Sequence, residues 1–139
     1  MPLTKLQRSD IMLKAVIIGA LVDNIGTLLV MTTLAALLAQ KGLSDDEVMA
    51  RMKSTNGLLL GLILGLGFTM LGGFFAGRLA GKRETLHGAL VALVGIVITI
   101  VFWEKGGPIW FDIAGFAGML PAGIFGGFLA MRRPPRKQA

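Results

Sequence analysis

The sequence contains no cysteine and only one histidine, and these shortages exclude several kinds of catalytic and metal-binding site. Without cysteine the chain has no disulfide, no thiol nucleophile and no thiolate metal site. No serine is placed with a basic partner as nucleophilic catalysis requires, so we expect no enzymatic activity, no bound metal and no cofactor. Charged residues are also scarce, at 16% of 139 residues, against 54% hydrophobic residues. That composition is too apolar for a soluble domain of this length and predicts a single integral membrane domain over residues 1–139.

The charges that are present are mostly basic, giving a net charge of +6 and a pI near 10.4. The lysines and arginines stand at the ends of apolar blocks and are not interleaved with aromatic residues, so we expect a lipid bilayer rather than nucleic acid as the partner. Ten of them fall in the leader, the turn after the second block and the tail, and four in the other two connectors. The positive-inside rule then predicts a multi-pass protein of the bacterial inner membrane with both termini in the cytoplasm.

Four apolar blocks are each long enough to cross a bilayer core of about 30 Å as a helix. The predicted spans are residues 15–39, 56–79, 86–103 and 108–131, and a cytoplasmic tail follows at 132–139. The predicted fold class is therefore an all-α membrane protein with four transmembrane helices.

A short amphipathic helix is predicted near residues 45–53, in the polar connector between the first two spans. Ser44 and Glu47 form an S-x-x-E capping box, in which each side chain bonds to the backbone N–H of the other residue. Three apolar side chains of this helix are expected to turn towards the membrane: Val48, Met49 and Met52. The two methionines are weak evidence for a soft-metal site, and an ordinary apolar face is the better interpretation.

Glycine recurs at every fourth position from residue 57 to 81, interrupted only by Thr69. Residues four apart share one face of a helix, and in lipid a face of small residues allows two helix backbones to touch. We expect a second small-residue face, on the fourth span, to be exposed and to support a homodimer or a larger assembly: Ala114, Gly118, Ala122 and Gly126. The glycines predicted to pack helices together are Gly57, Gly61, Gly65, Gly73, Gly77, Gly81, Gly118 and Gly126.

An internal repeat is indicated by two pairs of similar segments. Residues 19–26 resemble 88–95 at an offset of 69, and residues 72–78 resemble 126–132 at an offset of 54. One insertion of about the length of the polar connector explains the difference between the offsets. We predict two helical hairpins in the same orientation, related by a pseudo-two-fold axis along the membrane normal. Chance similarity between strings of glycine, alanine, leucine and valine is the alternative.

Asp23 is the leading candidate for a functional residue, because it lies far enough into the first span to be close to the bilayer midplane. A carboxylate at that depth costs about 2.5–3.5 kcal/mol and indicates a functional site by default. Its predicted partners are Asn24, Thr69 and the carbonyl of Ala117, which Pro121 leaves without a helical hydrogen bond. These oxygens form a predicted midplane site for a proton or small cation. The alternative, favoured on the sequence alone, is that Asp23 and Asn24 hydrogen-bond across helices and hold an assembly together.

Two further titratable residues receive ordinary interpretations. His87, at the start of the third span, is expected to be an interfacial residue rather than a pH sensor, because a switch also needs a bistable element. Asp112, near the outer end of the fourth span, is explained by compensation of the helix dipole and by interfacial solvation.

The segment GGFFAGRLAGKRETLHGALVALVG at residues 72–95 resembles a group of small, uncharacterised four-span bacterial inner-membrane proteins. They share a glycine-glycine-aromatic run, an A-G-R-x-A-G-K/R turn and a following H-G. The resemblance implies a four-helix bacterial membrane protein and no catalytic residues. Our leading expectation is a non-enzymatic oligomeric scaffold or accessory subunit packed through glycine-rich faces. The alternative is a minimal proton- or cation-coupled transporter or channel that uses Asp23.

Overall fold

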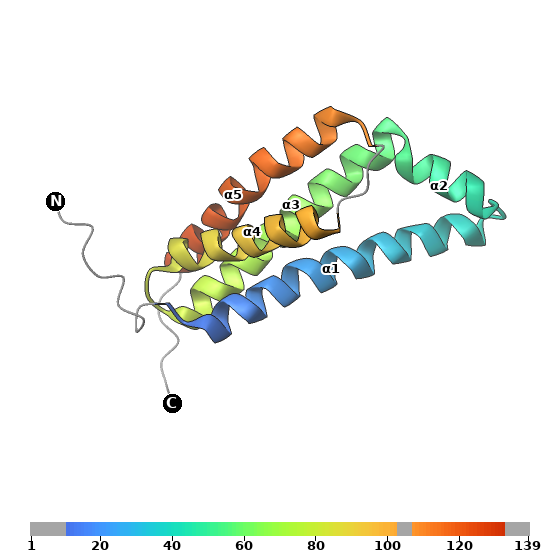
Figure 1. Ribbon diagram of the computed structural model, residues 1–139. Coiled ribbons are helices and arrows are strands. Elements are labelled where there is room, and N and C mark those ends of the chain that lie inside the picture. The colour runs from blue at the N-terminus through green and yellow to red at the C-terminus, as the bar shows by residue number, and fades with distance from the viewer. Residues whose placement is uncertain (1–10, 103–106, 133–139) are drawn as a thin grey trace.

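The computed structural model describes residues 11–102 and 107–132, and the regular structure in these residues is entirely helical (Figure 1). The five helices are α1 (Leu13–Gln40), α2 (Asp45–Lys53), α3 (Thr55–Ala80), α4 (Glu84–Val101) and α5 (Ile109–Met131). All except α2 are long and apolar enough to cross a membrane, which confirms the prediction of four such helices. Trp103 of the third predicted span, and the tail after Arg132, lie outside the described residues.

Helix α3 is the centre of the bundle and contacts each of the other four helices. Helices α4 and α5 pack against each other and against α3, while α1 packs against α3 and α4. Within the described residues α1 does not contact α5. Figure 1 shows α1 diverging from α4 and α5 towards the end where α2 connects it to α3. The bundle is therefore closed at one end and spread at the other.

Helix α2 is present over the predicted residues, and its capping box is formed. The Glu47 N–H donates to the Ser44 Oγ at 3.4 Å, and the Ser44 N–H donates to the Glu47 Oε2 at 2.8 Å. This backbone hydrogen bond, assisted by one from the Ser44 hydroxyl, lowers the pKa of Glu47 below its usual value. Val48 is buried within the protein, at 7% exposure, so the prediction that it turns towards the membrane is wrong. It faces inward because α2 packs on both α1 and α3.

The glycines of α3 face the rest of the bundle at four of the six predicted positions. A Cβ on Gly57 would lie 2.5 Å from the Met52 carbonyl oxygen, and one on Gly61 would lie 3.2 Å from the end of the Met31 side chain. Gly73 meets the backbone of α5, and Gly77 meets the start of α4. At these positions the absence of a side chain allows the close approach that small-residue faces provide in lipid.

Gly65 and Gly81 do not pack helices together, which corrects the prediction for these two residues. A Cβ on either would meet nothing within 4 Å. Gly81 ends α3 in the left-handed conformation, with φ +62°, and its N–H donates to the Gly77 carbonyl at 3.0 Å. Its role is that of a C-terminal helix cap, which glycine fills because it lacks a Cβ. Gly65 instead borders a cavity described below.

The small-residue face of α5 packs against α3 at Gly118 and Gly126, so the expectation that it is exposed is wrong for these two residues; Ala114 and Ala122 are half-buried. A Cβ on Gly118 would lie 2.8 Å from the Leu66 side chain, and Gly126 lies against the backbone of Met70 and Phe74 on α3. The face is occupied because α3 and α5 share an extensive contact along their lengths. The structure therefore leaves this face unavailable to a second copy of the chain.

Two glycine pairs that the sequence analysis did not single out form close helix contacts. Gly19 of α1 faces Gly72 of α3, and Gly88 of α4 faces Gly123 of α5, with each glycine placed against the carbonyl of its partner. The residue one turn after Gly19 is Asp23, which lies against Gly72. Ala92 lies against Gly123 in the same way.

These two glycine contacts resemble each other, but the residues and helices around them do not correspond as a two-fold repeat requires. The similar segments of the sequence align Gly72 with Gly126, whereas in the two contacts the position equivalent to Gly72 is Gly123. In addition, α3 contacts α4, while in the described residues α5 has no corresponding contact with α1. The repeat of two hairpins stays a prediction.

Candidate functional site

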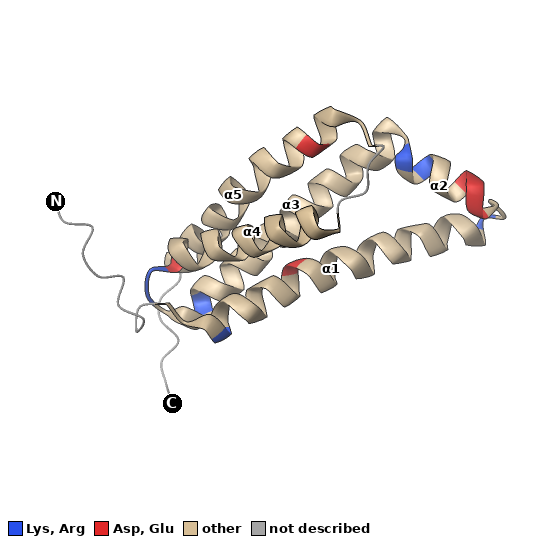
Figure 2. Ribbon diagram, viewed as in Figure 1, with Lys and Arg blue, Asp and Glu red and all other residues tan. Residues whose placement is uncertain are grey.

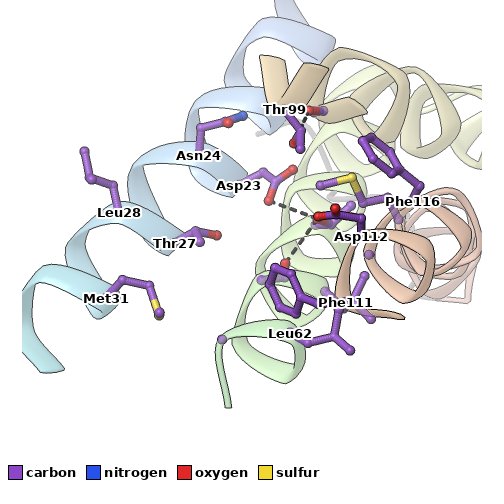
Figure 3. Close-up of a pocket in the computed structure, with 17 residues that line it drawn as sticks. Asp23, Asn24, Thr27, Leu28, Met31, Leu62, Thr99, Phe111, Asp112 and Phe116 are labelled. Carbon is purple, nitrogen blue, oxygen red and sulfur yellow. Dashed lines mark hydrogen bonds between the residues drawn. The ribbon is translucent and has the colours of Figure 1, made fainter. Parts of the chain in front are cut away.

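Asp23 is buried where α1 meets α3, and its carboxylate bonds to Thr69. Asp23 is 5% exposed and Thr69 is 1% exposed. The Thr69 hydroxyl lies 3.0 Å from the Asp23 Oδ1 and 3.1 Å from the carbonyl oxygen of Gly65, so it shares one hydrogen between two acceptors (Figure 3). The structure thus brings together two residues that the sequence placed at similar depth in different helices.

The second carboxylate oxygen of Asp23 lies towards α4. A Cβ built on Gly95 would be 3.3 Å from this Oδ2 atom, so glycine leaves the room that the carboxylate needs. Among the described residues no side chain or N–H donates a hydrogen bond to Oδ2. Within the described residues no fully buried side-chain oxygen lacks a hydrogen-bond partner, so Oδ2 borders open space and is available to a ligand.

A cavity of about 430 Å³ borders Asp23. Four helices contribute to its wall, and α1 and α5 line it without touching each other, so the cavity occupies the space between them. Its polar lining consists of Asp23, Asn24, Thr27, Thr69, Thr99 and Asp112. The described residues that line it include no lysine, arginine or histidine. Its charge is therefore set by carboxylates, which favours a positively charged occupant.

The remainder of the cavity wall is apolar and contains aromatic and thioether groups. These residues are Leu28, Met31, Leu62, Leu66, Phe111, Phe116 and Met119. Gly61, Gly65, Gly95 and Gly115 complete the lining, and the open space beside Gly65 belongs to the cavity. Figure 3 shows Asp23, Thr99 and Phe116 around this space.

The predicted partners of Asp23 do not all reach the cavity. Asn24 borders it, and its amide N–H donates to the Ala20 carbonyl of its own helix at 2.8 Å. Ala117 and Pro121 are exposed and do not line the cavity, so the prediction of a carbonyl ligand from Ala117 is wrong. A proline identifies which carbonyl loses its hydrogen bond but does not determine the direction in which it faces.

Asp112 is the main site residue that the sequence analysis missed. It stands in the first turn of α5 and borders the same cavity as Asp23. Figure 2 shows one acidic position on α1 and one on α5, and the other charged residue of these two helices is Lys14, at the start of α1. The sequence does contain a signal, because Asp112, Gly115, Phe116 and Met119 recur at helical spacing and therefore share a face.

His87 is fully buried, which corrects the expectation of an interfacial residue. Its Nε2 accepts a hydrogen bond from the Met12 N–H at 3.0 Å, and its Nδ1 lies 3.0 Å from the Arg83 carbonyl. A carbonyl only accepts and an N–H only donates, so Nδ1 is the donor and Nε2 the acceptor in this arrangement. Because Met12 precedes α1 and Arg83 precedes α4, His87 ties the beginnings of these two helices together.

The described residues contain no group of three histidine, cysteine, aspartate or glutamate side chains that could hold a metal ion. Comparison with known proteins gives no match to a family model, to a curated protein or to a solved structure. The geometry of the cavity beside Asp23 is therefore the basis on which a function is proposed below.

Proposed function

We propose that this chain is a non-enzymatic, multi-pass protein of the bacterial inner membrane, with both termini cytoplasmic, that acts as a minimal proton- or cation-coupled transporter or channel. One observation carries the proposal. Asp23 is buried at 5% exposure, yet its free carboxylate oxygen borders a cavity of about 430 Å³ whose described lining includes no basic residue. This departs from our first expectation of a scaffold, because the cavity supplies the space that an ion or substrate needs.

The energetics of a carboxylate inside a membrane support this function. An ionised aspartate at the bilayer centre costs about 2.5–3.5 kcal/mol and is normally paired or placed next to water. Thr69 satisfies one oxygen of Asp23 with a neutral hydrogen bond, which leaves the negative charge uncompensated. A bound proton or cation would neutralise that charge, and its loading and release at Asp23 would couple to its movement through the cavity.

A scaffold or accessory subunit is the second candidate function, and the Thr69–Asp23 hydrogen bond favours it. Interhelical polar contacts stabilise membrane bundles by about 0.6–2 kcal/mol, and such a contact needs no ligand. A homodimer or larger assembly would then form through other surfaces, because the small-residue face of α5 is occupied by α3. The apolar side chains exposed on the outside of the bundle fit a lipid environment under either function.

The proposed repeat indicates that Asp23 is not needed for helix packing. The paired contacts of Gly19 with Gly72 and of Gly88 with Gly123 support two related hairpins. In this arrangement Asp23 occupies the position that Ala92 holds in the second hairpin. A carboxylate that only one hairpin carries is not required by the packing itself, which fits a role in function.

The test is ion flux through the full-length protein reconstituted into liposomes. We expect imposed gradients of protons, sodium or rubidium to relax faster in vesicles that contain the protein than in empty vesicles. Asp23→Asn should remove this flux, and the variant should keep the elution volume of the unaltered protein in detergent. Asparagine retains an oxygen for Thr69, so folding should survive. Asp46→Asn on α2 is the matched control, because Asp46 is exposed and does not line the cavity. Absence of flux in the unaltered protein, with weaker assembly in Asp23→Asn, would establish the scaffold instead.

A further inference from the structure

We propose that the cavity between α1 and α5 binds an organic cation that carries apolar groups, such as a substituted ammonium or phosphonium. This inference rests on the proposed function and specifies the class of its substrate. The site combines a buried aspartate that has an unpartnered oxygen, a second carboxylate, and an apolar wall with two phenylalanines.

The size of the cavity argues for an organic ligand rather than a bare metal ion. A metal cation is held by several oxygen ligands at about 2.0–2.6 Å, which requires a compact cage. Here the volume is about 430 Å³, and the described residues provide no cluster of three metal-ligating side chains. Pockets of about 300–1,000 Å³ are typical of sites for small organic molecules.

The charges of the cavity select a cation. Asp23 offers an oxygen without a hydrogen-bond donor, and Asp112 adds a second carboxylate from α5. Asp112 stands in the first turn of α5, where the helix dipole offsets part of its charge. Asp23 lies far from either end of α1 and has no such compensation, so it is the principal counter-ion for the ligand.

The apolar wall suits the organic part of such a ligand. Phe111 and Phe116 supply aromatic faces, and a cation over an aromatic ring gains about 0.5–2 kcal/mol depending on its desolvation. Met31 and Met119 are unbranched and adapt to ligands of different shape. A hydrated inorganic ion would gain nothing from these groups.

The entrance to the cavity faces the lipid-exposed side of the bundle. Helices α1 and α5 line the cavity without contact between them, and Leu28 at its edge is 66% exposed. An apolar cation concentrates in the bilayer interface, from which this opening is accessible. The geometry therefore provides a lateral path to Asp23.

The experiment measures binding of two probes of the same shape and opposite charge, tetraphenylphosphonium and tetraphenylborate, to the purified full-length protein by equilibrium dialysis in detergent. Two variants separate binding in the cavity from general apolar binding. Gly65→Leu fills the cavity, whereas Gly67→Leu adds the same side chain to the same helix in open space that does not line it. Asp23→Asn tests the counter-ion, with Asp46→Asn as its control.

We expect saturable binding of the phosphonium and none of the borate beyond partition into detergent. Gly65→Leu and Asp23→Asn should each weaken phosphonium binding by at least about tenfold, because each removes a space or a charge that the buried cation needs. The control variants should change it by less than about twofold. Equal binding of both probes, or equal effects of the two leucine variants, would overturn the inference.

The same preparation distinguishes failure of this inference from failure of the proposed function. Flux of protons or sodium that depends on Asp23, without phosphonium binding, would overturn the organic-cation site and leave the proposed function standing. Absence of both flux and binding would overturn both. Phosphonium binding that is lost in Gly65→Leu, without any flux, would support the site and refute transport.

Discussion

The two ends of the bundle differ in what some of their glycines border. Where α1 and α4 begin and α3 and α5 end, glycine backbones touch at two pairs, Gly19 with Gly72 and Gly88 with Gly123; we term this the tight half. In the other half, which we term the open half, glycines such as Gly65 border the cavity. A glycine opposite a backbone brings helices together, whereas a glycine opposite a gap leaves volume.

This division explains how a four-helix bundle holds an empty space without losing its shape. In lipid, helix association depends on close van der Waals contact, and the tight half provides it through the glycine pairs. His87 accepts one hydrogen bond from the Met12 N–H, which joins the beginnings of α1 and α4 in the same half. The helix positions are thereby fixed at one end, and the open half is free to diverge around Asp23.

The substitution with the largest expected effect is Gly88→Leu, which should prevent α4 and α5 from packing against each other in the tight half. A Cβ at this position meets the backbone of Gly123, which has no side chain to move aside. We expect a loss of about 3 kcal/mol or more and largely unfolded or aggregated protein, measured by thermal unfolding and size-exclusion chromatography in detergent.

The matched control is Gly67→Leu, which places the same side chain in open space and should leave the midpoint of unfolding unchanged or slightly raised. Similar destabilisation by both leucines would show that the close glycine contact is not what holds the tight half together.

A smaller effect is expected from Thr69→Val, at the boundary between the two halves. Valine keeps the shape of threonine but removes the hydroxyl that donates to Asp23. A buried acceptor that loses its donor costs about 1–3 kcal/mol, and thermal unfolding in detergent should show this loss. Thr33→Val is the control, because Thr33 is exposed and bonds only to its own helix, at Leu29.

The same variant distinguishes a charge effect from a packing effect. If the cost arises from the unsatisfied Asp23 carboxylate, the double variant Thr69→Val/Asp23→Ala should lose less than the sum of the two single changes. Additive losses would contradict the view that this hydrogen bond connects the two halves.

Sequence reasoning predicted the elements of this structure better than their contacts. Hydropathy gave the four long helices, and the Ser44–Glu47 pair gave α2, because both signals are local. The contact between Asp23 and Thr69 was predicted because both residues lie at a similar depth in a bilayer, and the hydrogen bond between them confirms it. Depth, however, is a position along one axis only. Depth leaves rotation about the helix axis undetermined.

That missing rotation accounts for the errors. Ala117 has the right depth on α5 but faces outward, while Asp112 lies nearer the helix end and faces the cavity. The glycine repeat likewise does not specify which neighbour each glycine meets. Gly73 therefore faces a helix backbone, and Gly65 faces open space, although both belong to the same repeat.

The smallest expected effect concerns α2, which closes the end of the open half by linking α1 to α3. Ser44 lowers the pKa of Glu47 in the folded protein, so the capping box stabilises α2 above the ordinary pKa of glutamate, about 4.3. That stabilisation is lost as the pH falls through the lowered folded-state pKa, because the folded carboxylate must then take up a proton. The protection of the α2 amides against hydrogen exchange, expressed relative to the intrinsic exchange rate at each pH, should fall at acid pH. Glu47→Gln should abolish this loss of protection, with Asp46→Asn as the control.

Glu47→Gln should leave protection in the tight half unchanged at each pH, because Glu47 lies on α2 and the glycine pairs lie between the four long helices. If Glu47→Gln instead changes protection in α2 and in the tight half together, the two halves unfold as one unit. In that case the glycine contacts would depend on how the open end is closed, and the cavity could not change its shape independently of them.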